Sequence, residues 1–163
     1  MLYKYAVIVP ALNESGNLKI LVPNIFKNLS DSKVIIVDDS GDIENKKLHT
    51  VMLEHGNRVE IINRGQKLGR GSAIIDGLKS GMKDKNIRYF FEMDADLSHD
   101  PAELNRFLKL KDKYDMIVGS RYMQGSKITK WPWWRLAQSR VINKILNLWL
   151  GLSLTDYTDG YRL

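Results

Sequence analysis

Short runs of β-branched and aromatic residues alternate along this chain with longer stretches in which apolar residues recur every three or four positions. The short runs begin at Tyr5, Lys33, Arg58, Arg88 and Asp115. Apolar runs of this length are typical of strands that are buried on both faces of a sheet. Such strands, joined by helices, predict an α/β fold with three layers, in which helices cover both sides of a mostly parallel sheet.

Three of the intervening stretches have the spacing of amphipathic helices, within residues 18–29, 74–82 and 104–110. The third is preceded by Asp100 and Pro101, an N-cap residue followed by proline at the first helical position. Because no repeat or linker interrupts the pattern, we interpret residues 1–163 as a single domain. Its last residues have neither a strand nor a helix pattern, and we expect the domain to be incomplete at its C-terminal end.

The residues that follow the predicted strands are the candidates for chemistry, because ligands of parallel α/β sheets bind beyond the carboxyl ends of the strands. Acidic residues follow three of these strands and arginine follows two. These residues are Glu14, Asp38, Asp39, Arg64, Asp94, Asp96 and Arg121. Carboxylates at the end of a buried strand are costly unless a positive group meets them.

Asp94 and Asp96 end the fourth strand with one residue between them, in the segment FFEMDADLSHDP. As an isolated pattern, the pair is compatible with an N-cap and a solvated loop acid ahead of the helix at Pro101. Alternatively, two carboxylates at positions i and i+2 can converge on one hard cation, Mg²⁺ or Mn²⁺, which keeps room for substrate phosphates. The residues by themselves leave both interpretations open.

Asp38, Asp39 and Glu14 also have two interpretations each. The segment DDSGD is rich in turn-forming residues, which would explain both aspartates. Asp39 could instead accept hydrogen bonds from the ribose or the base of a nucleotide. Glu14 could be stabilised by the dipole of the helix that follows it, or it could face the same nucleotide. The segment KLGRGSAI resembles a glycine-rich phosphate cradle but lacks the spacing of a known phosphate loop, which favours a turn before a helix over direct contact with a ligand.

The composition narrows the range of partners. The formal net charge of +6 favours anionic partners. Basic residues are spread along the chain without a recognised nucleic-acid-binding module, so we expect no nucleic-acid partner. The chain has no cysteine, which excludes disulfides and thiolate metal sites. No apolar run is long enough for a signal peptide or a transmembrane helix.

Residues 127–154 combine tryptophans with lysines and arginines. Trp134, Val141, Ile145 and Leu148 fall on one helical stripe of this segment. One interpretation is a core helix with a solvated basic side. The other is an interfacial helix, with tryptophans at the depth of lipid headgroups and cations on anionic lipids.

Six segments of the chain occur in an order and at a spacing that resemble family 2 glycosyltransferases with the GT-A fold. They are VIVPALNE, IIVDDSGD, KLGRGSAI, MDADLSHDP, VGSRY and WPWWRLAQSRVIN. The resemblance covers essentially the whole chain and points to the branch of dolichol-phosphate mannosyltransferases and polyprenyl-phosphate glycosyltransferases. DDSGD is one residue shorter than the usual family pattern, so the resemblance assigns no role to Asp42.

The resemblance implies roles for individual residues. The donor nucleotide is expected to contact Pro10, Leu12, Glu14, Val37, Asp39, Asp94, Ala95 and Asp96. The implied ligands of a Mg²⁺ or Mn²⁺ cofactor are Asp94, Asp96 and Ser98. The acceptor phosphate is expected to meet Arg121, Arg135 and Ser139. The implied catalytic residues are Asp94, Asp96, Arg121 and Arg135, and Arg162 is a further candidate phosphate contact.

The resemblance also implies an activity: metal-dependent, inverting transfer of mannose from GDP-mannose to dolichyl or polyprenyl phosphate. A UDP-sugar donor, or a nucleotide-sugar-binding module without turnover, are the alternatives. A phosphate monoester has a second pKa of about 6, so the acceptor is largely a dianion near pH 7 and needs little help from a general base. The histidines then need no chemical role, although His99 adjoins the carboxylate pair. A lipid acceptor implies a cytoplasmic protein that is peripherally associated with the membrane surface.

Overall fold

A four-stranded parallel sheet forms the centre of the computed structural model, which describes residues 3–123, 132–152 and 154–163. The strands are β1 (Tyr5–Ala11), β2 (Ser32–Asp38), β3 (Val59–Asn63) and β4 (Tyr89–Glu92). Their spatial order is β3-β2-β1-β4, and all neighbouring pairs are parallel. Each strand matches an apolar run of the sequence, so the predicted α/β fold is confirmed.

The central strand is β1, whose apolar run is completely buried. Ala6, Val7, Ile8 and Val9 have no solvent-exposed surface. Successive side chains of a strand point to opposite faces, so Val7 and Val9 pack into one layer of the core and Ala6 into the other. Both faces of β1 therefore need an apolar cover.

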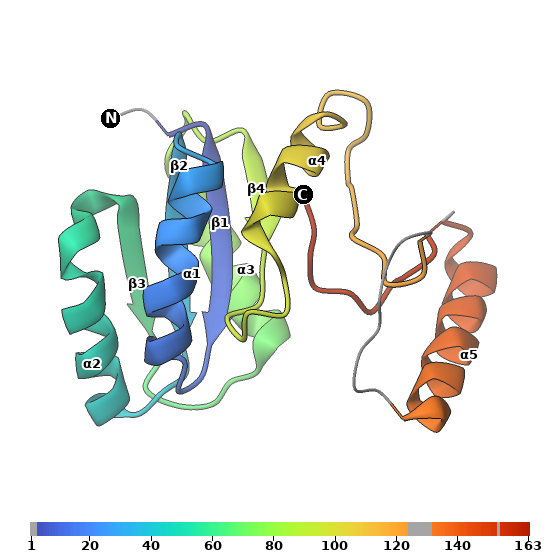
Figure 1. Cartoon of the computed structure of the whole chain (residues 1–163), viewed down its shortest axis with the longest axis horizontal. Coiled ribbons are helices and arrows are strands. Elements are labelled where there is room, and N and C mark those ends of the chain that lie inside the picture. Colours follow the sequence, from blue (N-terminus) through green and yellow to red (C-terminus); the bar gives the residue numbers. More distant parts are fainter. Residues whose placement is uncertain (1–2, 124–131, 153) are drawn as a thin grey trace.

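Helices supply this cover on both faces of the sheet (Figure 1). One face carries α1 (Ser15–Asn28), α2 (Asp42–Met52) and α4 (Leu104–Leu108), and the other carries α3 (Arg70–Gly81). Two 3₁₀ helices, η1 (Leu53–Arg58) and η2 (Pro101–Glu103), precede β3 and α4. The predicted cap is present, because the Asp100 side chain accepts a hydrogen bond from the amide of Ala102 at 2.9 Å.

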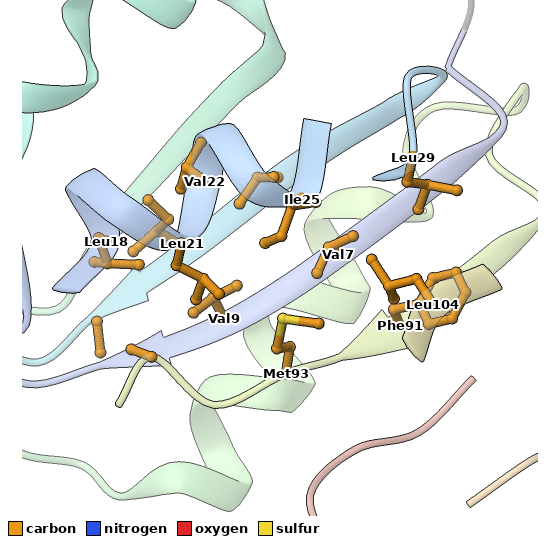
Figure 2. Close-up of a cluster of buried hydrophobic side chains, with 14 of the residues drawn as sticks. Val7, Val9, Leu18, Leu21, Val22, Ile25, Leu29, Phe91, Met93 and Leu104 are labelled. Atoms are coloured by element: carbon orange, nitrogen blue, oxygen red, sulfur yellow. The ribbon is translucent and has the colours of Figure 1, made fainter. Parts of the chain in front are cut away.

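The larger layer of the core lies between the sheet and α1 (Figure 2). Leu18, Leu21, Val22 and Ile25 of α1 are fully buried, which confirms the amphipathic face predicted within residues 18–29. On the opposite face, α3 approaches the sheet through glycine. A Cβ on Gly77 would lie 2.5 Å from Cγ2 of Ile8, so this close packing depends on the missing side chain.

The predicted fifth strand, at residues 115–120, does not form as a regular strand. Val118 makes one antiparallel bridge to Arg162, and Arg162 makes another to Glu92. Backbone hydrogen bonds hold residues 117–119 against residues 161–163. Among the described residues, none after β4 forms a further strand, in agreement with the missing strand pattern at the end of the chain. The short pairing with residues 117–119 joins distant segments, so it leaves no periodic pattern in the sequence.

Helix α5 (Trp133–Leu150) lies apart from the sheet, on the β4 side (Figure 1). The buried residues of this helix are polar, namely Ser139 and Asn143. The stripe that runs from Trp134 to Leu148 is exposed, so the interpretation of that stripe as part of a core is wrong. Within the described parts of the chain, no helix is both long enough and apolar enough to cross a membrane.

Candidate functional site

The order of the strands reverses at β1, because the chain runs outward from β1 through β2 to β3 and then crosses back to place β4 on the other side of β1. In open parallel sheets, this reversal leaves a crevice at the carboxyl ends of the strands on either side of it. Residues 94–96 follow β4, and residues 10–14 end β1 and lead into α1. The topology thus brings these two predicted segments together.

A cleft of about 340 Å³ occupies the crevice, and we call it the acidic cleft. It is lined by Pro10, Ala11, Leu12, Glu14, Asp39, Lys67, Gly69, Arg70, Ala73, Asp94, Ala95 and Asp96. All residues predicted to contact a nucleotide are among these except Val37. The side chain of Val37 is completely buried in the core beside α3, so it does not line the cleft.

Asp38 and Asp39 have different surroundings although they are adjacent. The Asp38 carboxylate is buried and accepts hydrogen bonds from the amide of Ser40 at 3.1 Å and from Nδ2 of Asn45 at 2.9 Å. Turn formation therefore accounts for Asp38. Asp39 lines the acidic cleft instead.

Asp39 forms a nearly buried ion pair with Arg64. Nε of Arg64 lies 2.5 Å from Oδ1 of Asp39, and the two side chains are 5% and 7% exposed. Oδ2 of Asp39 accepts hydrogen bonds from the amides of Leu68 and Gly69, at 2.9 and 3.1 Å. Burial alone would raise the pKa of the Asp39 carboxyl, but the hydrogen bonds from Arg64 and from these amides outweigh burial and lower it. Asp39 thus fixes the loop ahead of α3 against the end of β2.

Asp94 lies at the mouth of the acidic cleft between two cationic or polar side chains. Nε of Arg70 donates a hydrogen bond to Oδ1 of Asp94 at 2.9 Å. The backbone amide of Asp94 donates to Nδ1 of His99 at 3.1 Å. Both the carboxylate and the backbone of Asp94 are therefore held by residues from other positions of the chain.

Asp96 is exposed, and its carboxylate accepts a hydrogen bond from the amide of Ser98 at 3.0 Å. The limited loss of solvent around this carboxyl would raise its pKa, but the hydrogen bonds from Ser98 outweigh that effect and lower the pKa. Leu97, between them, has a φ of +62°, which is a strained backbone conformation for leucine. Strain of this kind is characteristic of ligand-binding segments.

The carboxylate pair fits a hard divalent cation. Asp94 and Asp96 both line the cleft and supply oxygen ligands of the type that Mg²⁺ and Mn²⁺ prefer. Mg²⁺ is commonly held by one or two carboxylates together with waters and substrate phosphates. Among the described residues, there is no group of three or more His, Cys, Asp or Glu side chains arranged to hold a metal ion.

Arg121 lies outside the acidic cleft and lines a second cleft of about 600 Å³ beside α5. Its guanidinium makes two hydrogen bonds of 2.7 Å to the buried carboxylate of Asp156. These hydrogen bonds raise the pKa of Arg121. Arg140 and Lys144 of α5 line the same cleft, so its wall is basic.

The other residues predicted to meet the acceptor phosphate lie elsewhere. Arg135 is exposed in the first turn of α5, and Ser139 is buried. The hydroxyl groups of Ser139 and Tyr122 lie 2.6 Å apart, which joins α5 to the segment after Arg121. Arg162 donates hydrogen bonds to backbone carbonyl groups of its own segment. The structure thus brings Arg121 to a cleft but does not bring Ser139 or Arg135 to the lining of either cleft.

His99 connects the two regions. Its Nε2 lies 3.3 Å from Oδ1 of Asp159, and Asp159 lies 3.5 Å from Nε of Arg121. The imidazole also stacks on the ring of Tyr161, with ring centres 4.9 Å apart. A chain of polar contacts therefore runs from the carboxylate pair to the second cleft.

Sequence reasoning missed the roles of Arg70 and Asp159 in this site. Arg64 is among the residues predicted to follow a strand, but its partner Asp39 is 25 positions away and leaves no local signal. Arg70 lies in KLGRGSAI, whose spacing favours a turn, yet Gly69 and Arg70 line the acidic cleft. Asp159 also leaves no local signal, because its contacts with His99 and Arg121 join residues far apart in the sequence. His99 was singled out only for its position beside the carboxylates, and that proximity is now explained by its hydrogen bond with the Asp94 amide.

Comparison with curated proteins identifies relatives of similar sequence. Polyprenol monophosphomannose synthase of Mycolicibacterium smegmatis is 35% identical over 158 residues, which are 96% of this chain and 59% of that protein. Undecaprenyl-phosphate mannosyltransferase of Micrococcus luteus is 32% identical over 155 residues, 95% of this chain and 63% of that protein. This chain thus spans less than two thirds of the length of these relatives.

Among solved structures, glucosyl-3-phosphoglycerate synthase of Mycobacterium tuberculosis, in complex with Mn²⁺, UDP and phosphoglyceric acid, has a similar fold. The TM-score is 0.65 at 16% identity, over 98% of this chain and 55% of that one. The model of the family described as glycosyl transferase family 2 matches residues 6–163. Together with the acidic cleft at the strand-order reversal and these relatives, this match establishes that the chain belongs to glycosyl transferase family 2.

Proposed function

We propose that this chain transfers mannose from GDP-mannose to a polyprenyl phosphate, with a divalent cation and with inversion at the sugar. The observation that carries the proposal is the acidic cleft at the strand-order reversal, with Asp94 and Asp96 at its mouth. The names of the curated relatives, which are a polyprenol monophosphomannose synthase and an undecaprenyl-phosphate mannosyltransferase, support the choice of sugar and acceptor.

The acidic cleft would hold the donor nucleotide. Pro10 and Leu12 offer apolar surface to a base. The Asp39 carboxylate accepts three hydrogen bonds within the chain, and a carboxylate has about four acceptor sites, so it keeps capacity for a hydroxyl of the ribose. Glu14 lines the same wall.

Asp94 and Asp96 would hold the cation, with Ser98 as a further contact. When bound, Mg²⁺ or Mn²⁺ would stabilise the negative charge that grows on the leaving diphosphate. Lys67 and Arg70 line the same cleft and add positive charge on the side of α3. The chain thus offers both anionic groups for a cation and cationic groups for a diphosphate.

Arg121 would neutralise and aim the acceptor phosphate from the second cleft, which Arg140 and Lys144 also line. Arg135, which lines neither cleft, remains a candidate for this role on the resemblance alone. An oxygen of this phosphate would attack the anomeric carbon as the bond from that carbon to the diphosphate breaks, and attack from the opposite side inverts the configuration. Since the phosphate is largely a dianion near pH 7, no side chain needs to remove a proton. Guanidinium groups suit this role because they bind phosphate oxygens in pairs.

The exposed face of α5 would contact the membrane that carries the acceptor. Trp133, Leu148 and Trp149 are 79%, 89% and 80% exposed, whereas an ordinary surface helix exposes its polar side. Arg140 and Lys144 lie beside this face and could reach anionic headgroups. A helix with this arrangement lies in the interface rather than across it.

Transfer of labelled mannose from GDP-mannose to undecaprenyl phosphate in the presence of Mn²⁺ tests the activity. We expect label in the lipid extract for the wild-type chain, and none for Asp96→Asn or when the metal is chelated. Faster transfer from a UDP-sugar than from GDP-mannose would show that the donor is a UDP-sugar rather than GDP-mannose. Binding of GDP-mannose by calorimetry without transfer would favour a binding module and contradict the enzymatic proposal.

Sedimentation with vesicles of phosphatidylcholine and phosphatidylglycerol tests the membrane contact. Leu148→Ser with Trp149→Ser removes apolar surface worth about 3 kcal/mol or more when buried, so we expect binding to be weaker by roughly a hundredfold or more. Ile43→Ser is the matched control, because Ile43 is 77% exposed on α2. Equal binding of the wild type and the α5 variant would contradict the assignment.

A further inference from the structure

Arg70 occupies the position in which it neutralises Asp94. Arg70 is the first residue of α3, and Nε of its guanidinium lies 2.9 Å from Oδ1 of Asp94. Nη2 lies 3.6 Å from Oε2 of Glu92, at the end of β4. One guanidinium thus meets two carboxylates at the mouth of the acidic cleft, and its side chain is still 42% exposed.

Gly160 completes the packing around this guanidinium. Nη2 of Arg70 donates a hydrogen bond to the carbonyl oxygen of Gly160 at 3.2 Å. A Cβ at position 160 would collide with Nη2, would lie 2.9 Å from Cζ of Arg70, and would lie 3.1 Å from Oδ1 of Asp94. The absence of a side chain at Gly160 therefore leaves the space that Arg70 fills.

Arg70 and a metal ion compete for the same carboxylate. A divalent cation bound by Asp94 and Asp96 would add a second positive charge to the Asp94 carboxylate, which already accepts a hydrogen bond from Arg70. Two positive groups on one carboxylate repel each other, so binding of the cation alone favours displacement of the guanidinium. A long, half-exposed arginine at the start of a helix can move away without disturbing the core.

We propose that Arg70 is a positioning residue with two binding states. Without the cation it binds the Asp94 carboxylate, and when the cation is bound it binds the diphosphate of the donor instead. This inference rests on the proposed function, since it assumes a cation and a nucleotide diphosphate in the acidic cleft. The diphosphate gives the displaced guanidinium a new anionic partner, for which arginine has the right geometry. Cation and nucleotide therefore bind cooperatively, and each strengthens the binding of the other by the same factor.

Binding of Mn²⁺ alone, followed by electron paramagnetic resonance, tests the first half of the inference. Arg70→Gln removes the competing charge, and we expect it to bind Mn²⁺ roughly fivefold more tightly than the wild type, the size expected for a partly exposed charge pair. Arg70→Lys keeps the charge and should stay near the wild type. Arg88→Gln is the matched control, because Arg88 is exposed just before the other end of β4.

Binding of GDP with and without saturating Mn²⁺, measured by calorimetry, tests the second half. The wild type should bind GDP more tightly when Mn²⁺ is present, and Arg70→Gln should reduce this coupling about fivefold or more. A merely structural role for Arg70 would lower the affinity for both ligands together. An affinity for Mn²⁺ alone that is unchanged or weaker in Arg70→Gln, or no Mn²⁺ binding by either protein, would overturn the inference.

Gly160→Ala provides a second variant that leaves the charge unchanged. Its methyl group displaces the guanidinium sterically but also lies 3.1 Å from Oδ1 of Asp94, so we expect it to raise the affinity for Mn²⁺ alone in the same direction as Arg70→Gln and by a smaller factor. Unchanged Mn²⁺ affinity in a folded Gly160→Ala protein would contradict the claim that Arg70 fills the space beside Gly160. If the variants shift Mn²⁺ and GDP binding as expected but no mannose is transferred, the proposed function is wrong. The inference that the cation replaces Arg70 at Asp94 would then still hold.

Discussion

The imidazole of His99 joins Asp94 to Asp159, with Nδ1 accepting a hydrogen bond from the Asp94 amide at 3.1 Å and Nε2 lying 3.3 Å from Oδ1 of Asp159. Stacking on Tyr161 fixes the plane of the ring. This side chain therefore sets the position of the carboxylate pair relative to the segment that ends the chain.

His99→Ala removes the acceptor of the Asp94 amide and leaves Asp159 without this partner. We expect a loss of about 1 to 3 kcal/mol in the free energy of unfolding and weaker binding of GDP with Mn²⁺. His99→Asn offers an oxygen near the position of Nδ1 and should recover most of the ligand binding. His49→Ala, at an exposed position of α2, should change neither quantity. Calorimetry and urea denaturation measure the two effects, and identical ligand binding by His99→Ala would contradict this role.

Arg64→Met leaves the carboxylate of Asp39 nearly buried and without its ion-pair partner. Removal of one member of a buried pair costs about 3 to 5 kcal/mol, and we expect a loss of this size in urea denaturation. Arg106→Met is the control, because Arg106 is 76% exposed and pairs with Glu103 on the surface. That change should cost less than about 1 kcal/mol. Similar losses for the two variants would show that the nearly buried Asp39–Arg64 pair stabilises the fold no more than a surface ion pair does.

The Asp39 carboxyl also predicts a dependence of stability on pH. Its pKa in the folded protein lies below the ordinary value of 3.8, so its charged form stabilises the fold above that pH. The stabilisation is lost as the pH falls from about 3.8 through the lower folded value. The difference in free energy of unfolding between the wild type and Asp39→Asn should therefore be largest above pH 4 and should shrink in stronger acid. If this difference in free energy of unfolding stays constant from pH 7 to pH 3, the Asp39 carboxyl does not contribute to the pH dependence of stability.

Arg121 is predicted to act in transfer as well as in stability. Arg121→Gln removes the two guanidinium hydrogen bonds of the buried Asp156 carboxylate but leaves those from Thr158, so we expect a loss of roughly 2 to 3 kcal/mol in stability. Arg121→Gln combined with Asp156→Asn should recover most of the stability but not the mannose transfer. GDP-mannose affinity should fall less than the transfer rate in both variants. Recovery of transfer in the double variant would assign Arg121 a structural role alone.

Two glycines of α3 give opposite predictions for the same substitution. Gly77→Ala forces a methyl group to within 2.5 Å of Ile8, and overpacking of this kind costs about 1 to 3 kcal/mol. Gly71→Ala meets no atom within 4 Å and should stabilise the helix by up to about 1 kcal/mol. Thermal denaturation distinguishes the two, and a stabilised Gly77→Ala protein would contradict the close packing of α3 on β1.

The sequence by itself determined the four strands of the sheet, three of the helices that cover it (α1, α3 and α4), and the strand ends at which the candidate site lies, but it did not indicate α2. These features depend on the alternation of apolar runs with amphipathic stretches, which are local patterns. The position of Asp94 and Asp96 at the cleft follows from the same source, because residues that end parallel strands lie at one edge of the sheet. The cap at Asp100 was equally local, since its partner is the amide two residues later.

The tertiary structure alone decided which of two adjacent aspartates lines the cleft and which partner each carboxylate has. Adjacent residues at the end of a strand can point in opposite directions, and Asp38 and Asp39 do. The partner of Asp94 is Arg70, 24 positions away, and it is chosen by the packing of α3 on the sheet. In α5 the polar Ser139 and Asn143 are buried while Leu148 is exposed, because contacts with distant segments, rather than the hydrophobic pattern of the helix, decide which side packs.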